Sequence, residues 1–200
     1  ILIVMFFMCL QITIAQAQQP ADYVNPIIGA VTYGEKTTDA HGFGKTFPGA
    51  ATPFGLVQLS PDTRTGGDNG PGYSWNHKTI EGFSFTHMSG IGWYGDLGNF
   101  LVMPTTGPLR TAKGNDVSPE QGYRSRYSHE SEIAKAGYYA VTLDDYHIRA
   151  ELTAAPRAGM IRFTFPENEQ SRVQIDLSRR IGGTSTEQYF KVIDDSTLCG

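Results

Sequence analysis

The residues from Gly82 to Pro104 include the side chains best suited to chemistry on a small polar ligand. Two strand-like runs, Phe83–Thr86 and Phe100–Met103, are joined by a glycine-rich loop that also carries serine, tryptophan, tyrosine and aspartate. Glycine permits backbone conformations and close approaches that side chains forbid, so this loop can bring its backbone near a ligand. An aromatic face beside acidic and hydroxyl groups suits a sugar, which stacks on the ring and bonds the polar groups.

Trp93 is the strongest candidate in this loop, because a tryptophan between Gly92 and Tyr94 is awkward to bury by local packing. Each candidate also has a purely structural alternative. Trp93 and Tyr94 could be folded into the core as part of a long β-connection. His87 could bond the nearby backbone, and Asp96 could cap a turn. The candidate sugar-binding residues are His87, Ser89, Gly90, Gly92, Trp93, Tyr94 and Asp96.

A second loop contains Asp62 and Arg64, which could line the same cleft as the glycine-rich loop. The alternative for these two residues is an ion pair on the surface, an interaction that contributes little to stability.

No residue of this sequence is assigned a catalytic or metal-binding role. The paired acids Asp144-Asp145 and Asp194-Asp195 lie at expected turns, where aspartate bonds its own backbone. The five histidines show no spacing typical of zinc ligands. The run Gly82–Thr86 contains a serine, but it lacks the Gly-x-Ser-x-Gly pattern and the following helix of a nucleophile elbow.

The first residues predict export. Residues 1–14 are almost wholly apolar, and Ala15-Gln16-Ala17 is a small-x-small cleavage site, so residues 1–17 are interpreted as a signal peptide that begins inside its apolar region. The alternative is a buried N-terminal helix. The apolar run is shorter than the ~20 residues that a membrane-spanning helix needs, so no span is expected. Cys9 in this run is not expected to carry a lipid anchor.

Residues 18–200 are then one domain by size. Of the two cysteines, Cys9 is removed with the signal and Cys199 is the penultimate residue, so no internal disulfide is expected. An exported chain without disulfides fits a bacterial periplasm, cell surface or extracellular space. The net charge of −4 with scattered basic residues argues against nucleic-acid binding.

The expected architecture is an all-β antiparallel sandwich. Short strand candidates before residue 119 are Phe54–Ser60 and the two runs around the glycine-rich loop, and only Glu130–Ala136 has helical character. Four period-two runs between Tyr138 and Leu177 predict neighbouring antiparallel strands. Residues 179–199 also read as strand and turn. The side chains expected in the core are Val141, Ile148, Ala150, Leu152, Ile161, Phe163 and Val173.

Five stretches, taken in order, resemble the N-terminal domain of glycoside hydrolase family 92, the exo-acting α-mannosidases, over about residues 23–176. They are Tyr23–Gly29; Phe47–Thr63; Gly72–Trp75; the glycine-rich loop with Met103–Gly107; and Gly137–Leu143 running on to Glu151–Ala154 and Arg157–Pro166.

The resemblance implies a β-sandwich followed by a helical (α/α)-barrel domain, with the active site at their junction. It also implies calcium dependence and inversion of the anomeric centre, which calls for a general acid and a general base. In the family these carboxylates, and most calcium ligands, come from the C-terminal domain. The chain is therefore expected to be inactive alone. It is also expected to be a piece of a longer protein that is cut at both ends.

Two classes of function follow. In the first, the chain is the substrate-lining domain of a secreted α-mannosidase that removes terminal mannose from N-glycans or mannan, with the C-terminal domain as its partner in cis. In the second, it is a carbohydrate-binding module without chemistry of its own. An amidase that releases whole N-glycans is a further variant, although these residues supply no amidase chemistry.

Overall fold

Strands account for most of the regular structure. The computed structural model describes residues 18–31, 44–64, 71–89, 97–181 and 186–200. Within these ranges the helices are single 3-10 turns, and no helix has the length and apolarity that a membrane crossing requires. The 3-10 turns are η1 (Pro20–Tyr23), η3 (Pro119–Gln121) and η4 (His129–Ser131). The strands are β1 (Ala50–Ala51), β2 (Gln58–Asp62), β3 (Thr79–Ile80), β4 (Gly82–Ser84), β5 (Leu101–Thr105), β6 (Ser125–Arg126), β7 (Ile133–Lys135), β8 (Tyr138–Leu143), β9 (Ile148–Ala155), β10 (Ala158–Thr164), β11 (Arg172–Asp176), β12 (Lys191–Asp194) and β13 (Thr197–Cys199).

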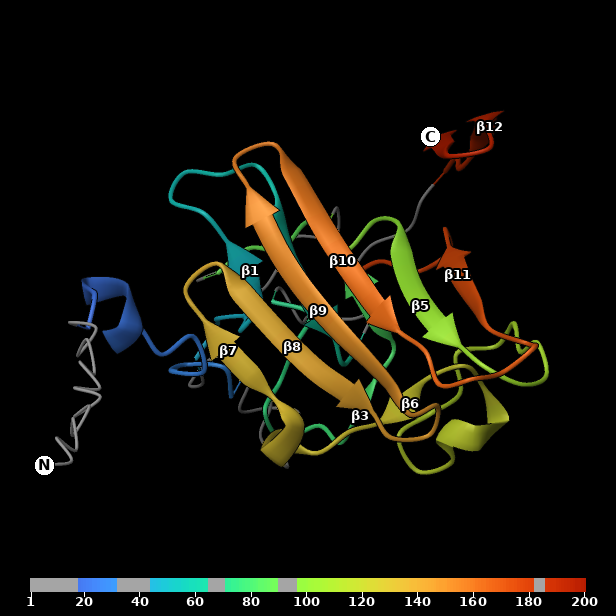
Figure 1. The fold of residues 1–200 in the computed structure, drawn as a ribbon, viewed down its shortest axis with the longest axis horizontal. Coiled ribbons are helices and arrows are strands. Elements are labelled where there is room, and N and C mark those ends of the chain that lie inside the picture. Colours follow the sequence, from blue (N-terminus) through green and yellow to red (C-terminus); the bar gives the residue numbers. More distant parts are fainter. Residues whose placement is uncertain (1–17, 32–43, 65–70, 90–96, 182–185) are drawn as a thin grey trace, which may run out of the picture.

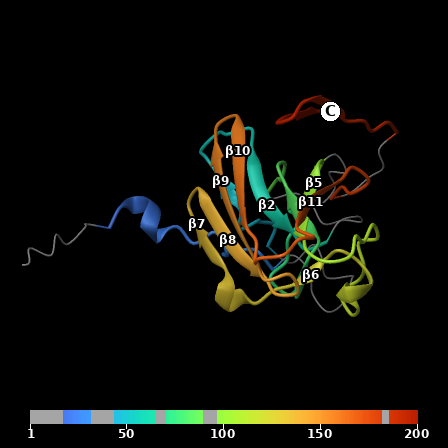
Figure 2. The same cartoon turned by 45° about the vertical axis from the view of Figure 1, so that its right-hand side comes forward.

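Two antiparallel sheets pack face to face and make the chain an all-β sandwich, as Figures 1 and 2 show. One sheet has the strand order β1-β2-β4-β5-β11, and the other has the order β10-β9-β8-β7. Two small pairs, β3-β6 and β12-β13, complete the described structure. The sandwich predicted from alternating hydrophobicity is therefore confirmed.

The core lies between the two sheets. Phe83 on β4 contributes from one sheet, and Val141, Ile148 and Leu152 contribute from the other, all at 1% exposure or less. Phe163 on β10 is half-buried, and its ring packs against that of Phe83 with centroids 5.9 Å apart. Because side chains on alternate positions of a strand share one face, the period-two runs place these residues together.

The predicted meander is confirmed for its first three strands and wrong for the fourth. β8, β9 and β10 are antiparallel neighbours, with Val141 opposite Ala150 and Phe163 opposite Ala150 on the other side. β11 instead crosses to the other sheet and pairs with β5, where Val173 lies opposite Pro104.

Polar contacts explain why β11 turns its polar side chains inward and its apolar side chains outward. Gln174 accepts a hydrogen bond from the hydroxyl of Thr105 at 2.8 Å, and Asp176 accepts one from the hydroxyl of Tyr123 at 2.7 Å. The intervening Val173 and Ile175 are therefore 51% and 41% exposed, so the predicted burial of Val173 is wrong.

Two local predictions are also corrected. The segment expected to be helical, Glu130–Ala136, is the end of the η4 turn followed by β7. The strand expected from Phe54 begins only at Gln58, because Phe54 has a positive φ of 58° and lies in a turn closed by a hydrogen bond from Gly55 N to Thr52 O. Residues 191–199 do form strand and turn, as predicted.

Candidate functional site

Asp62 and His87 form a fully buried pair at the start of the predicted binding loop. The Nε2 atom of His87 lies 2.9 Å from Oδ1 of Asp62, and neither side chain is exposed. Nδ1 of the same ring lies 2.7 Å from the carbonyl oxygen of Gln58. The hydroxyl of Ser84 donates to Oδ2 of Asp62 at 2.5 Å. Since β2 and β4 pair antiparallel with Ser60 opposite Ser84, Asp62 and Ser84 project from the same face.

Segments distant in sequence meet at this pair. The ring of Phe47 lies beside that of His87, with centroids 5.4 Å apart and an angle of 37° between the ring planes. Gly72 has a positive φ of 74°, and a side chain there would collide with Oδ1 of Asp62 and crowd the buried Ile181. The backbone N–H of Ile181 in turn donates to Leu97 O at 2.9 Å. The residues that border the predicted binding loop are thus packed onto one buried polar centre.

This arrangement is not a Ser-His-Asp nucleophilic centre. In such a centre, one histidine nitrogen takes the serine proton and the other donates to the aspartate. Here the nitrogen nearest Ser84 Oγ, at 3.3 Å, is the one that faces Asp62, while the other nitrogen faces Gln58. The serine is buried and donates its proton to the aspartate. The group is built to hold the backbone rather than to attack a substrate.

The structure places only part of the predicted sugar-binding set. Ser89 is exposed, whereas His87 is buried and both of its nitrogens face acceptors within the protein. A sugar hydroxyl could reach that ring only by displacing one of these partners, although the binding role itself stays a prediction. Five of the predicted residues lie outside the described residues: Gly90, Gly92, Trp93, Tyr94 and Asp96.

The suggested surface ion pair between Asp62 and Arg64 is wrong for the aspartate. Asp62 is fully buried and pairs with His87, whereas Arg64, two residues later, is exposed. Both Thr63 and Arg64 donate their backbone N–H groups to Gly72 O, at 2.9 and 3.2 Å. The second loop therefore meets the first through the contact between Asp62 and His87.

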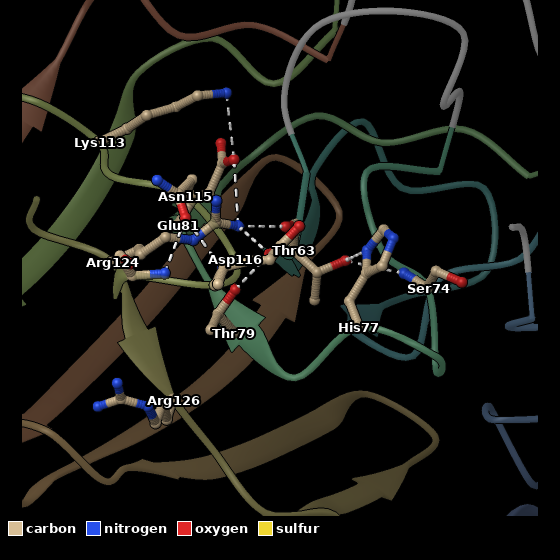
Figure 3. A network of polar contacts seen from close by, with 12 residues as sticks. Thr63, Ser74, His77, Thr79, Glu81, Lys113, Asn115, Asp116, Arg124 and Arg126 are labelled. Carbon is tan, nitrogen blue, oxygen red and sulfur yellow. Dashed lines mark hydrogen bonds and ion pairs between the residues drawn. The ribbon is translucent and has the colours of Figure 1, made fainter. Parts of the chain in front are cut away.

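A larger polar network includes Thr63, the residue that follows Asp62 in the chain (Figure 3). Arg124 is 4% exposed, and its Nη2 donates to Thr63 O at 2.9 Å while lying 3.3 Å from Oε1 of the buried Glu81. Nη2 also lies 2.9 Å from Oδ1 of Asp116, and Nζ of Lys113 lies 3.3 Å from Glu81 Oε1. Two cations thus face the buried Glu81 carboxylate, which is engaged by partners inside the fold.

His77 extends this network on the far side of Thr63 (Figure 3). Its Nδ1 lies 2.8 Å from the hydroxyl oxygen of Thr63, which also accepts the backbone N–H of Ser74 at 2.9 Å. Burial lowers the pKa of His77; Asp116 opposes this effect, and the positive charge of Arg124 adds to it. The neutral imidazole is therefore favoured, which suits a ring that serves as a hydrogen-bond partner inside the fold.

A third buried acid, Glu132, is surrounded by aromatic residues. Its carboxylate accepts hydrogen bonds from the hydroxyl of Tyr73 at 3.0 Å and from that of Tyr139 at 2.5 Å, and it also bonds Nδ1 of His129. Burial, and then the charge of Glu132, raises the pKa of Tyr139 well above its ordinary value. Like the carboxylates of Asp62 and Glu81, the carboxylate of Glu132 contacts polar groups within the protein.

The described residues do not include a cluster of carboxylates of the kind that binds calcium. Calcium takes six to eight oxygen ligands, mostly carboxylates, carbonyls and waters. Within the described ranges no three His, Cys, Asp or Glu side chains come together in a way that could hold a metal ion. The buried carboxylates of Asp62, Glu81 and Glu132 already face histidine, arginine, lysine or tyrosine donors.

A hollow of about 250 Å³ adjoins the end of the predicted binding loop. Asn99 and Phe100, directly before β5, line it together with Arg180, Gln188 and Tyr189. Planar polar groups beside aromatic rings are the mixture expected for a sugar. Neither this hollow nor the packing of Phe47, Gly72 and Ile181 around His87 was predicted from the sequence, because no periodic or spacing signal links these segments.

Comparison with known proteins identifies the family. Residues 23–200 match the model of the glycosyl hydrolase family 92 N-terminal domain. The chain therefore belongs to glycoside hydrolase family 92 and comprises its N-terminal domain, as the sequence motifs indicated.

Solved structures with this fold include family members that act on mannosides. A family GH92 α-mannosidase from Bacteroides thetaiotaomicron, solved in complex with mannoimidazole, is 42% identical with a TM-score of 0.80, over 89% of this chain and 22% of that one. An inverting family GH92 mannosidase from Bacteroides thetaiotaomicron VPI-5482 is 28% identical with a TM-score of 0.64, over 80% of this chain and 20% of that one.

A curated relative points the same way. An uncharacterized secreted glycosidase from Arthroderma benhamiae is 29% identical over 150 residues, which cover 73% of this chain and 17% of that protein. The chain thus spans roughly a fifth of the length of these relatives.

Proposed function

We propose that this chain is the substrate-lining N-terminal domain of a secreted α-mannosidase that removes terminal mannose from N-glycans or mannan with inversion. The observation that carries the proposal is the 42% identity and 0.80 TM-score to a family α-mannosidase solved with mannoimidazole. The relative described as a secreted glycosidase supports export of the protein to the periplasm, cell surface or medium.

The domain would bind and orient the sugar rather than supply the acid and base. Inversion needs two carboxyl groups about 6.5–9.5 Å apart, with room between them for the sugar and a water molecule. The buried acids Asp62, Glu81 and Glu132 are instead held by internal cations and hydroxyl groups. We therefore place the general acid, the general base and the calcium ligands in a helical domain that continues the same polypeptide.

The test is expression of the complete reading frame to which this sequence belongs. The purified protein should release mannose from an aryl α-mannoside, and NMR should show β-mannose as the first-formed anomer because the bond is cleaved with inversion. Chelation should abolish this activity and added calcium should restore it.

Residues 18–200 expressed alone should show no turnover. Binding of mannose glycans by the complete protein without hydrolysis would replace this proposal with the carbohydrate-binding module.

A further inference from the structure

Phe54 combines full exposure with an unfavourable backbone conformation. Its side chain is 105% exposed, so the ring is surrounded by solvent rather than by other side chains of the domain. Its φ of 58° lies in the left-handed region, which bulky residues rarely adopt. Strain of this kind persists only where the surrounding structure fixes it, and it is concentrated at functional sites. Within the described structure, no burial of the ring offsets this strain.

Neighbouring residues fix the turn that presents Phe54. The N–H of Gly55 donates to Thr52 O at 3.0 Å, and a Cβ atom added to Gly55 would lie 2.4 Å from Oγ1 of Thr52. Leu56 donates its N–H to Pro156 O at 2.8 Å, which ties the turn to the connection between β9 and β10 in the other sheet. The side chain of Leu56 is also exposed. The fold therefore holds two apolar side chains in solvent on a fixed turn.

A second exposed phenylalanine with a positive φ lies at the same end of the sandwich. β2 and β5 both pair antiparallel with β4, so they run in the same direction and begin at the same end of the sheet. Phe54 lies in the turn before β2, and Phe100, with a φ of 56°, lies directly before β5. Neighbouring strands are about 4.8 Å apart, so the starts of β2 and β5 are roughly 10 Å apart across β4.

The β12–β13 pair adds apolar side chains beside Phe100. The exposed Phe190 and Leu198 line, together with Phe100 and Gly200, a hollow of about 650 Å³. Figure 1 shows the C-terminus at the end of the sandwich where β5 and β10 begin. Any polypeptide that continues from Gly200 therefore starts beside Phe100. We define the apolar end of the domain as Phe54, Leu56, Phe100, Phe190 and Leu198.

We propose that the apolar end is a docking surface for the part of the polypeptide that follows Gly200, with Phe54 and Leu56 as its anchors. This inference rests on the proposed function, which continues the chain in a further domain. The matched part of this chain covers only 17% to 22% of the relatives, so most of a protein of their length lies outside it.

The chemistry of the apolar end favours a protein partner over a glycan. Exposed groups of apolar side chains mark protein interfaces, because their burial removes apolar surface from water. A phenylalanine that is already fixed in one position loses little freedom when it enters a pocket on a partner. The aliphatic side chains of Leu56 and Leu198 offer no hydrogen bonds to sugar hydroxyl groups.

Hydroxyl-radical footprinting of the complete protein measures the exposure of these side chains. The labelling of each residue in the native protein is divided by its labelling in urea, which corrects for differences in reactivity. This ratio should be several-fold lower for Phe54 and Leu56 than for Val117. Val117 is an exposed control in the segment between β5 and η3, which Figure 1 shows at the opposite end of the sandwich.

The same experiment distinguishes the other occupants. Ratios for Phe54 and Leu56 as high as that of Val117 would overturn the proposal. Protection that appears only as the protein concentration rises would identify a second copy as the partner, and protection that appears only with added mannan would identify a glycan. Either result would also overturn it.

Thermal melting of the complete protein gives a test in which the two interpretations predict opposite signs. Asparagine adopts the left-handed region with little strain, so Phe54→Asn should raise the melting temperature if the ring stays in solvent. It should lower the melting temperature if the ring is buried by the rest of the chain. His147→Asn is the matched control, because His147 is exposed, has a φ of 53° and precedes β9 at the opposite end. A rise for both variants would overturn the docking surface.

A photo-cross-link identifies the partner without any measurement of activity. p-Benzoylphenylalanine in place of Phe54 should join, on irradiation, to a peptide beyond residue 200 of the same molecule, and a cross-link only between copies would contradict the proposal. A complete protein that forms the intramolecular cross-link but hydrolyses no mannoside would refute the proposed activity and leave the docking surface in place. An active mannosidase with Phe54 freely labelled would refute the docking surface alone.

Discussion

The imidazole of His129 lies flat on the indole of Trp75, with ring centroids 3.5 Å apart and an angle of 9° between the planes. Nε2 of His129 lies 2.8 Å from Trp75 O, and Nδ1 bonds the carboxylate of Glu132. Tyr127 meets the same imidazole edge-on at 5.3 Å. This cluster fastens the loop after residue 72 to η4 and to β8, on which Tyr139 lies.

Removing Glu132 should destabilise the domain strongly. Glu132→Ala leaves the buried hydroxyls of Tyr73 and Tyr139 and Nδ1 of His129 without their acceptor, and we expect a loss of about 3–5 kcal/mol. Denaturant titration with far-UV detection measures this change. Glu130→Ala, on the exposed side of η4, is the control and should leave the midpoint unchanged. Equal midpoints for the two variants would show that the cluster contributes nothing.

The same cluster predicts sensitivity to alkali. Burial, with a further contribution from the charge of Glu132, raises the pKa of Tyr73, Tyr127 and Tyr139 above the ordinary value of about 10. A raised pKa in the folded state means that stability is fully present below about pH 10. It is lost as the pH rises further, because only the unfolded tyrosines release protons freely. The part of the absorbance change at 295 nm that comes from these buried tyrosines should therefore accompany the loss of the circular dichroism signal above pH 10. Full tyrosine ionisation with the β-sheet signal intact would contradict this expectation.

The network of Figure 3 provides a test of buried against exposed ion pairs. Arg124→Met leaves Glu81, which is 1% exposed, without its buried cation, and we expect a loss of about 3–5 kcal/mol. The double variant with Glu81→Leu should recover much of this loss, since no buried charge is left unpaired. Arg162→Met breaks the shorter but exposed pair with Glu151, at 2.6 Å, and should cost far less. Urea titrations of all three variants measure these changes in the free energy of unfolding. Equal losses of stability for Arg124→Met and Arg162→Met would show that burial does not make the first pair more important.

The fold was predictable wherever one strand face is apolar. Period-two alternation identified β8, β9 and β10, because their inward side chains are carbon-rich and their outward ones include Glu151 and Arg162. The same rule failed for β11, whose apolar Val173 and Ile175 face outward while Gln174 and Asp176 bond internal hydroxyls. Alternation determines which residues share a face, but it does not determine which face a neighbouring strand will cover.

The candidate site was predictable only as a set of loops. Glycine and aromatic content marked the stretch that follows His87, but nothing in the spacing of Asp62 and His87, 25 residues apart, indicates that their side chains form a buried hydrogen-bonded pair. That contact depends on β2 pairing with β4, a long-range event. Gly72 shows the same limit, since the collision that requires glycine exists only once Asp62 is in place.

The corrected sheet topology can be tested by a pair of core and surface substitutions. Phe83→Ala removes a fully buried ring between the sheets and should cost about 3–5 kcal/mol. Phe163→Ala should cost less, because that ring is only half-buried. Val173→Ala should leave stability within about 0.5 kcal/mol of wild type, because this side chain is 51% exposed. A large loss for Val173→Ala, measured by thermal melting, would favour the fourth meander strand instead.

Trp93 gives the sharpest test of the binding loop, although it lies outside the described residues. If it stacks on the sugar, Trp93→Ala in the full-length enzyme should lower kcat/KM by an amount equivalent to about 1–3 kcal/mol of transition-state binding. The melting temperature should fall far less than for a buried tryptophan, whose truncation costs about 3–5 kcal/mol. Tyr23→Ala, which removes an exposed aromatic side chain of η1, is a matched control. A large loss of melting temperature with near-normal kcat/KM would place Trp93 in the core, and the loop would then have no binding role.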